Sequence, residues 1–166
     1  NCFYIGMRLA CRLRPIRSAI ICSKNMTEEV EKQGVSFDKF PLEQPLRDAI
    51  DKLGFEYCTP IQAESLVYTL EGHDVTGRAQ TGTGKTAAFL ITIINDLLKN
   101  PIEEQRFLAE PRALVVAPTR ELAIQIASDA VKLTACCDLH TVVLVGGEDY
   151  QKQTRALDAK PVDIVV

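Results

Sequence analysis

The sequence predicts an α/β protein built on an open, doubly wound parallel sheet. Short apolar runs, such as residues 112–117, 141–145 and 162–166, alternate along the chain with longer amphipathic segments. Continuously apolar runs are typical of strands buried on both faces, as in a parallel sheet covered by helices. The alternation is typical of βαβ units, which bind ligands at the carboxyl ends of their strands. We therefore expect functional residues directly after each strand.

Composition and charge exclude several other classes of protein. The chain has 166 residues, of which 46% are hydrophobic and 25% charged, and its formal net charge is −3. These values fit one globular domain and exclude collagen-like and disordered chains. No apolar run approaches the ~18 residues that a membrane-spanning helix needs. The six cysteines lack C-x-x-C spacing, so they predict neither a disulfide framework nor a zinc site and fit a reducing compartment.

The amino-terminal segment differs from the rest, because residues 1–25 hold five basic residues and no acid. Three interpretations stay open: an organelle transit peptide, upstream sequence translated ahead of a true start at Met26, and a basic anchor to membrane or RNA. We expect residues 1–35 to be a poorly ordered extension or non-native leader and residues 36–166 to form the folded domain. The chain does not begin with Met and ends on an apolar run, so we expect a piece truncated on its carboxyl-terminal side.

Helices are predicted from apolar periodicity and from capping residues. Residues 42–53 have apolar side chains at helical spacing, with Pro45 in the first turn and Gly54 as the terminal cap. Thr59 and Pro60 predict the N-cap and first residue of a second helix that ends near Leu70. Further helices are expected over residues 85–99, 119–135 and 148–159, and strands over 74–78, 112–117, 141–145 and 162–166.

The first of these strands leads into Ala79-Gln80-Thr81-Gly82-Thr83-Gly84-Lys85-Thr86. Gly84-Lys85-Thr86 at the end of this segment fits the phosphate-loop pattern G-x-x-x-x-G-K-[ST], although Ala79 stands at the first glycine position. Glycines let such a loop turn tightly and aim its N–H groups inward, and the following helix adds its positive end. Lys85 offers a charge to the phosphates and Thr86 a hydroxyl to Mg²⁺. The sequence therefore predicts phosphate binding.

Upstream of this loop, the segment Gly54-Phe55-Glu56-Tyr57-Cys58-Thr59-Pro60-Ile61-Gln62 resembles the Q motif of the DEAD-box RNA helicase family. Residues 79–86 match the family's motif I, including its alanine. The resemblance implies that the Gln62 amide reads the adenine edge of ATP and that Phe37 stacks on the ring. An amide can do so because it carries both a donor and an acceptor. The alternatives are a solvated helix residue for Gln62 and a core residue for Phe37, with Phe40 a rival for the stacking role.

Two further motifs resemble the RNA-facing elements of this family, each directly after a predicted strand. Residues 117–122 (Ala-Pro-Thr-Arg-Glu-Leu) match motif Ia, and Gly146-Gly147 match the GG doublet. The resemblance implies that Pro118, Thr119 and the start of the next helix hold an RNA phosphate, and that the glycine pair approaches the RNA backbone. Arg120 has two open roles, an RNA contact or a structural bridge to a carboxylate.

The resemblance spans about residues 36–166 and implies a RecA-like domain with ATP and Mg²⁺ as cofactors. Lys85 and Thr86 are the expected catalytic residues, and RNA is the expected partner, bound through its backbone with little sequence specificity. The bacterial RhlB-type subgroup is resembled most, in Thr69-Leu70-Glu71-Gly72, in Gly147-Glu148-Asp149-Tyr150-Gln151-Lys152-Gln153 and in the loop leading to Pro111-Arg112-Ala113-Leu114. This resemblance implies mRNA turnover, possible membership of an RNA-decay complex, and a bacterial cytoplasm. An organelle is the alternative if residues 1–25 are a transit peptide, and no membrane association is expected.

Several family motifs do not occur in residues 1–166: Thr-Pro-Gly-Arg, Asp-Glu-Ala-Asp, Ser-Ala-Thr and a second RecA-like domain with its arginine finger. Their carboxylates and arginines position the attacking water and stabilise transition-state charge. We expect this chain alone to bind nucleotide weakly and not to hydrolyse ATP, whereas the full-length protein is an ATP-dependent RNA helicase. Two alternatives stay open: another superfamily 2 DNA or RNA translocase, and a truncated, non-catalytic nucleotide- or RNA-binding module.

Overall fold

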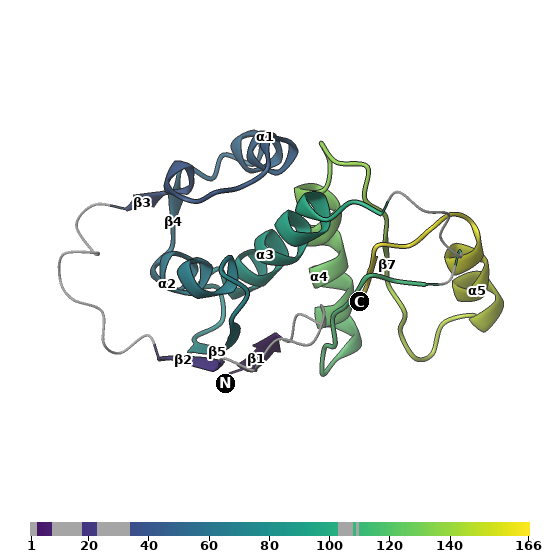
Figure 1. Cartoon of the computed structure of the whole chain (residues 1–166). Coiled ribbons are helices and arrows are strands. Elements are labelled where there is room, and N and C mark those ends of the chain that lie inside the picture. Colours follow the sequence, from purple (N-terminus) through teal and green to yellow (C-terminus); the bar gives the residue numbers. More distant parts are fainter. Residues whose placement is uncertain (1–2, 8–17, 23–33, 103–107, 109) are drawn as a thin grey trace. The chain divides into compact units, whose positions relative to one another are not determined.

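The computed structural model describes the chain except for residues 1–2, 8–17, 23–33, 103–107 and 109 (Figure 1). The chain forms two compact units. The first contains Asn1–Leu42 and Gly54–Thr92, and the second contains Glu43–Leu53 and Ile93–Val166. This division does not test the boundary predicted between residues 35 and 36, which stays a prediction.

The first unit is built around β5 (Asp74–Ala79), the strand that precedes the phosphate loop. β5 pairs in parallel with β2 (Ser18–Cys22) and antiparallel with β1 (Phe3–Met7). Two strands therefore lie within the segment for which the sequence predicts poor order. Its residues 1–2, 8–17 and 23–33 lie outside the described residues. A second, antiparallel pair joins β3 (Val35–Ser36) to β4 (Tyr57–Cys58), and two-residue strands of this kind leave no period to detect in a sequence.

The helices of the first unit begin where the sequence predicts. α2 spans Pro60–Thr69 and α3 begins at Lys85. A short 3₁₀ helix, η1 (Phe37–Lys39), is not among the predicted helices. Ile61 on α2 packs with Val75 and Ala79 on β5 in a buried apolar cluster. α3 (Lys85–Lys99) continues into the second unit, and its residues Leu90, Ile91 and Ile94 are fully buried. The phosphate loop therefore lies between β5, of which Val75 and Ala79 are buried, and a helix with a buried apolar face.

The second unit contains a three-stranded parallel sheet, which confirms the predicted fold class. Its strand order is β6 (Ala113–Leu114), β8 (Ile164–Val165), β7 (Thr141–Val142). The strands are shorter than predicted, but backbone hydrogen bonds continue beyond them, from Val115 N to Val165 O (2.8 Å) and from Leu144 N to Val166 O (2.8 Å). The helices of this unit are α1 (Gln44–Lys52), α4 (Arg120–Leu133) and α5 (Tyr150–Asp158).

The prediction that all these strands are buried on both faces is wrong for the runs around β6 and β7, since Val142 is buried but Leu144 is 37% exposed. Residues 162–166 around β8 are buried throughout, whereas Leu114 is 69% exposed and Val116 is 82% exposed. In the part of the chain that the structure describes, β6 lies at the edge of its sheet, and alternate side chains of an edge strand can face solvent. An apolar run shows that a strand can be buried, but it does not show whether one face or both faces are covered by other elements.

A buried ion pair connects the beginnings of the three strands. Asp163 Oδ2 accepts the His140 N–H (2.9 Å), and Asp163 Oδ1 lies 3.6 Å from Arg112 Nη1, with both side chains largely buried. Arg112 Nη2 also donates to the carbonyls of Leu97 (3.1 Å) and Asn100. These bonds attach the end of α3 to the sheet of the second unit. None of the helices in the described part of the chain has both the length and the apolar character required to cross a membrane.

Candidate functional site

The phosphate loop has the backbone that its sequence predicts. Gly82 and Gly84 have φ values of +81° and +87°, in the left-handed region that glycine alone enters without strain. The Thr83 hydroxyl donates to the Gln80 carbonyl (2.8 Å) and holds the turn closed. α3 begins directly afterwards, so the free N–H groups and the positive end of the helix dipole lie at the loop. This arrangement provides the donors that a phosphate group needs.

The Lys85 ammonium lies over this loop. Its Nζ donates to the Ala79 carbonyl (2.6 Å) and to the Gln80 carbonyl. These bonds place the lysine charge at the carboxyl end of β5, where the topology of α/β sheets puts ligands. Thr86 follows on the first turn of α3, and its hydroxyl makes no hydrogen bond to another group within the described residues.

Two side chains at the start of α2 attach that helix to the phosphate loop. Gln62 Oε1 accepts the Thr59 N–H (2.8 Å), and Gln62 Nε2 donates to the Gly84 carbonyl (3.1 Å). The Thr59 hydroxyl donates to the neighbouring carbonyl of Thr83 (2.8 Å). Gln62 is only 5% exposed, so the interpretation as a solvated helix residue is wrong. The sequence predicts Thr59 as an N-cap but gives no sign of its bond to Thr83, because that partner lies 24 residues away.

The two candidate stacking residues are both buried. Phe37 is 5% exposed and Phe40 is 7% exposed. Burial agrees with the alternative that Phe37 is a core residue. The stacking role of Phe37 stays a prediction.

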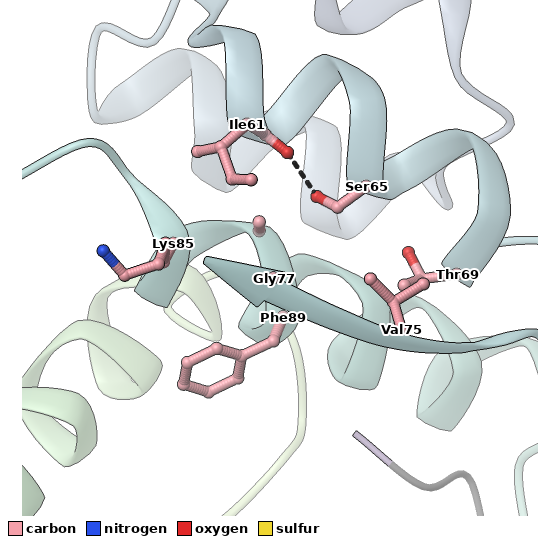
Figure 2. A pocket seen from close by; sticks show the side chains of 8 residues that line it. Ile61, Ser65, Thr69, Val75, Gly77, Lys85 and Phe89 are labelled. Carbon is pink, nitrogen blue, oxygen red and sulfur yellow. Dashed lines mark hydrogen bonds between the residues drawn. The ribbon is translucent and has the colours of Figure 1, made fainter. Parts of the chain in front are cut away.

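A small apolar cavity of about 40 Å³ lies between α2, β5 and α3 in the first unit (Figure 2). Ile61, Ser65 and Thr69 line it from α2, Val75 and Gly77 from β5, and Lys85, Ala88 and Phe89 from α3. The Ser65 hydroxyl donates to the Ile61 carbonyl (2.6 Å), so α2 satisfies this polar group internally. A cavity of this volume has room for a few water-sized groups and is too small for a nucleotide.

Burial perturbs two ionisable groups near the start of α2. It raises the pKa of the Cys58 thiol to about 12, which keeps this cysteine protonated and unreactive at neutral pH. Burial also raises the pKa of the Glu64 carboxyl, whose Oε2 has no hydrogen-bond partner within the described residues. Among all the residues that the structure describes, no three His, Cys, Asp or Glu side chains lie close enough together to hold a metal ion.

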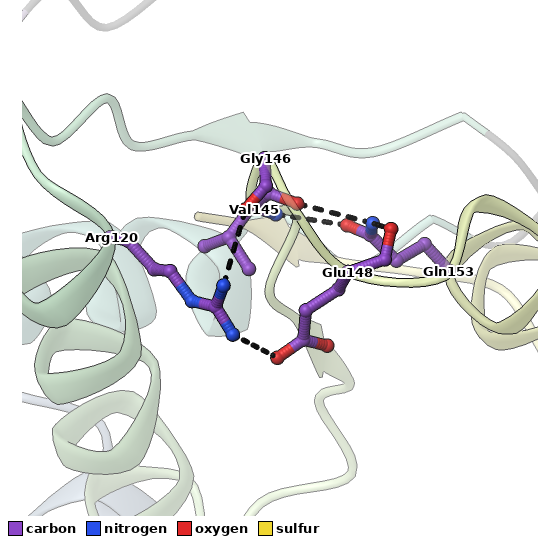
Figure 3. A network of polar contacts seen from close by, with 5 residues as sticks. All are labelled: Arg120, Val145, Gly146, Glu148 and Gln153. Atoms are coloured by element: carbon purple, nitrogen blue, oxygen red, sulfur yellow. Dashed lines mark hydrogen bonds and ion pairs between the residues drawn. The ribbon is translucent and has the colours of Figure 1, made fainter.

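The second unit brings together the residues after β6 and the residues after β7. Thr119 is the N-cap of α4, and its Oγ1 accepts the Leu122 N–H (3.3 Å). Arg120 reaches to the loop after β7, where Nη1 donates to the Gly146 carbonyl (3.4 Å) and Nη2 pairs with Glu148 Oε1 (3.0 Å) (Figure 3). The contact that a structural bridge to a carboxylate requires is therefore present. Pro118 is exposed beside it.

Comparison with known proteins decides the family. Residues 59–166, well over half of the chain, match the family model described as DEAD/DEAH box helicase. The chain belongs to the DEAD/DEAH box helicase family. Its relatives include ATP-dependent RNA helicase RhlB from Pseudomonas putida, 54% identical over 138 residues that cover 83% of this chain and 35% of the relative. RhlB from Shewanella pealeana is 52% identical over 130 residues, covering 78% of this chain and 30% of the relative.

Solved structures of helicases have a similar fold. The RNA helicase Prp28 from Chaetomium thermophilum, bound to ADP, has a TM-score of 0.68 at 34% identity, with 78% of this chain and 31% of that chain covered. A DEAD box protein from Methanococcus jannaschii has a TM-score of 0.61 at 32% identity, with 79% and 34% covered. These likenesses confirm the predicted DEAD-box fold and the resemblance to bacterial RhlB. The chain spans about a third of the length of these relatives.

The Q motif and motif I of this DEAD-box chain meet in the first unit, and motif Ia and the GG doublet meet in the second. Two residues that hold the second site are missing from the sequence-based prediction: Glu148, which pairs with Arg120, and Gln153, whose side chain bonds the backbone of Val145. Both lie in the stretch 147–153 that resembles the RhlB type, but the sequence gives neither of them a role, because both act through partners fixed by the tertiary fold.

Proposed function

We propose that this chain is the ATP-binding and RNA-contacting part of an ATP-dependent RNA helicase. The observation that carries the proposal is the attachment of the Q motif to the phosphate loop, through Gln62 to Gly84 and Thr59 to Thr83. A group that reads a base and a loop that holds phosphates have to keep a fixed spacing to select a nucleotide. The relatives named ATP-dependent RNA helicase, and the ADP-bound Prp28, support the same function.

In this proposal the nucleotide binds along the first unit. Phe37 and Gln62 receive the adenine, and the loop formed by Ala79, Gln80, Thr81, Gly82, Thr83 and Gly84 surrounds the phosphates with backbone N–H groups. Lys85 neutralises phosphate charge, and the Thr86 hydroxyl is a ligand of Mg²⁺. Mg²⁺ keeps several waters and binds through one or two protein groups plus phosphates, so a single hydroxyl fits its coordination chemistry. Bound Mg²⁺ would neutralise charge that develops on the phosphates.

In the same proposal, the second unit binds the sugar-phosphate backbone of RNA. Thr119 accepts a hydrogen bond from Leu122, which leaves its O–H proton available to a phosphate oxygen. Pro118, Arg120, Gly146 and Gly147 border the same site, with Arg120 acting as the bridge to Glu148. Membership of an RNA-decay complex and a bacterial cytoplasmic location are parts of the same proposal, supported by the similarity to bacterial RhlB.

The test is equilibrium binding of Mg·ATP, Mg·GTP and magnesium tripolyphosphate to the 166-residue chain and to Gln62→Ala. Gln125→Ala, a truncation of an exposed glutamine on α4, is the matched control. We expect wild type and the control to prefer ATP over GTP. If Gln62 reads adenine, its truncation removes this preference and leaves tripolyphosphate binding unchanged. If Gln62 only positions the loop, ATP and tripolyphosphate weaken together.

Equal affinity of the wild-type chain for ATP and GTP, or no binding of either, would contradict the proposal. The same preparation also tests the expectation that this chain alone does not hydrolyse ATP. RNA-stimulated phosphate release from residues 1–166 would show that the chain contains a complete catalytic site.

A further inference from the structure

The loop between β7 and α5 is held from one side by a single glutamine. Gln153 Oε1 accepts the Val145 N–H (2.9 Å), and Gln153 Nε2 donates to the carbonyls of Val145 (3.2 Å) and Glu148 (3.5 Å) (Figure 3). One uncharged side chain thus bonds the backbone immediately before and immediately after Gly146-Gly147. Gln153 is half-buried on α5, and the glycines are exposed.

The same loop is held from the other side by Arg120 of α4, which bonds the Gly146 carbonyl and the Glu148 carboxylate. Gly147 has φ +81°, and a Cβ at this position would lie 3.3 Å from Arg120 Nη1. Two side chains and one glycine conformation therefore fix the path of four backbone units. Within the described residues, the N–H groups of Gly146 and Gly147 bond no acceptor, so they are donors presented by a constrained loop.

We propose that Gln153 is a positioning residue, which holds the Gly146-Gly147 backbone in the orientation that binds an RNA phosphate. This inference rests on the proposed function of the second unit as an RNA-contacting surface. A donor that is already fixed binds more tightly than a mobile one, because no ordering entropy is lost on binding. Gln153 acts through the loop, and truncating it frees both ends of the glycine pair.

A positioning role and a purely structural role differ in measurable ways. Gln153 bonds a surface loop and not the core, so its truncation should leave Tm and Mg·ATP affinity close to wild type. The variant removes no cation, so the slope of log Kd against log salt should not change, whereas loss of one cation–phosphate contact lowers it by about one unit. A weaker RNA complex with an unchanged salt slope is the signature of a misplaced backbone donor.

The experiment measures binding of a labelled single-stranded oligouridylate to the 166-residue chain by fluorescence anisotropy at several salt concentrations. The variants are Gln153→Ala, Gln153→Glu, and the control Gln151→Ala, which truncates an exposed glutamine two residues earlier on α5. We expect Gln153→Ala to weaken RNA binding roughly three- to tenfold, the range that one or two net hydrogen bonds represent. Gln153→Glu keeps an acceptor for the Val145 N–H but loses the donor and adds a negative charge near the phosphate, so it should bind RNA no more tightly than Gln153→Ala.

The outcomes separate this inference from the function on which it rests. Equal RNA affinity of Gln153→Ala and Gln151→Ala would overturn the positioning role while leaving the RNA-binding function in place. Absence of RNA binding by wild type would overturn the proposed function, and the inference with it. Hydrogen exchange of the Val145 amide adds a readout that needs no RNA: exchange as slow in Gln153→Ala as in wild type would show that Gln153 does not hold the loop.

Discussion

Replacement of Asp163 by alanine should be among the most destabilising single changes in the second unit. Asp163 is 5% exposed and accepts a hydrogen bond from His140 N–H (2.9 Å) beside the Arg112 guanidinium (3.6 Å). Alanine would leave a partly buried backbone N–H without its acceptor and a largely buried cation without its carboxylate. Both groups lie where β6 and β7 begin, so the register of the sheet depends on them.

The size of the loss follows from these contacts. A hydrogen bond to a charged group contributes about 1.5–3 kcal/mol, and removal of one partner of a buried ion pair costs about 3–5 kcal/mol. Arg112 keeps its bonds to the carbonyls of Leu97 and Asn100, so the lower end of that range applies. We expect Asp163→Ala to lower the free energy of unfolding by about 3 kcal/mol, which is a decrease of roughly 10 °C in Tm for a chain of this size. Asp163→Asn keeps an acceptor for His140 and should lose about half as much.

Urea unfolding followed by circular dichroism measures this difference, with the m-value as a check that the unfolded state is unchanged. Asp129→Ala is the matched control, because Asp129 makes an exposed i,i+3 pair with Lys132 (3.2 Å) on α4. Such a pair contributes about 0–1 kcal/mol, so the control should unfold like wild type. A loss below about 1 kcal/mol for Asp163→Ala, or equal losses in the two variants, would refute the conclusion that Asp163 holds the beginnings of the three strands together.

Three further changes test the first unit. Gly77→Ala should raise the free energy of unfolding by about 0.5–1 kcal/mol, because its Cβ would meet Ile61 Cδ1 at 3.8 Å beside a cavity; a loss of stability in urea would contradict this. Gly84→Ala should weaken Mg·ATP binding more than Gly82→Ala. Both glycines have positive φ, which costs alanine about 1–2 kcal/mol, but only at Gly84 would the Cβ collide with Gln62 Nε2 (2.4 Å); equal effects would exclude a role for that contact. Burial raises the pKa of Glu64, so its ionisation destabilises the fold as pH rises from below 4.5 through the folded pKa. The free energy of unfolding of Glu64→Gln, measured relative to wild type, should therefore be higher at pH 7 than at pH 4. A difference between the two proteins that does not change with pH in urea unfolding would contradict this.

The helices could be predicted from the sequence because their signals are local. Thr59 and Pro60 mark the start of α2, and Lys85 marks the start of α3, each within a residue or two of the observed boundary. Helix periodicity depends on one face being buried, and that face is present in the sequence itself. The strands were less well defined, since Leu114 and Val116 have the apolar character of buried residues but are exposed.

The candidate sites could be predicted as motifs, whereas the bonds that hold them could not. The four motifs have fixed residue types at fixed spacing, so each is visible in a single sequence. The two roles open for Arg120 differ only in whether a carboxylate lies within reach, and Glu148 is 28 residues away. The role of Gln153 likewise depends on the turn that brings α5 back to the end of β7, where its side chain bonds Val145. A sequence shows which groups are present, and the fold decides which of them are close enough to bond.

The contacts observed at these sites also determine how ligand binding has to work. Gln62 bonds Thr59 and Gly84, and Arg120 bonds Gly146 and Glu148. If adenine or phosphate uses the same amide or guanidinium, binding exchanges one hydrogen bond for another, so the net gain per contact is far smaller than the gross strength of the bond. The exchange also couples each ligand to a loop, because release of the Gly84 carbonyl or of Glu148 changes the constraints on the backbone that binds the next group. Truncations at Gln62 or Arg120 therefore alter loop geometry together with ligand contact, and at Gln62 the comparison of ATP with a ligand that lacks the base, such as tripolyphosphate, separates the two effects.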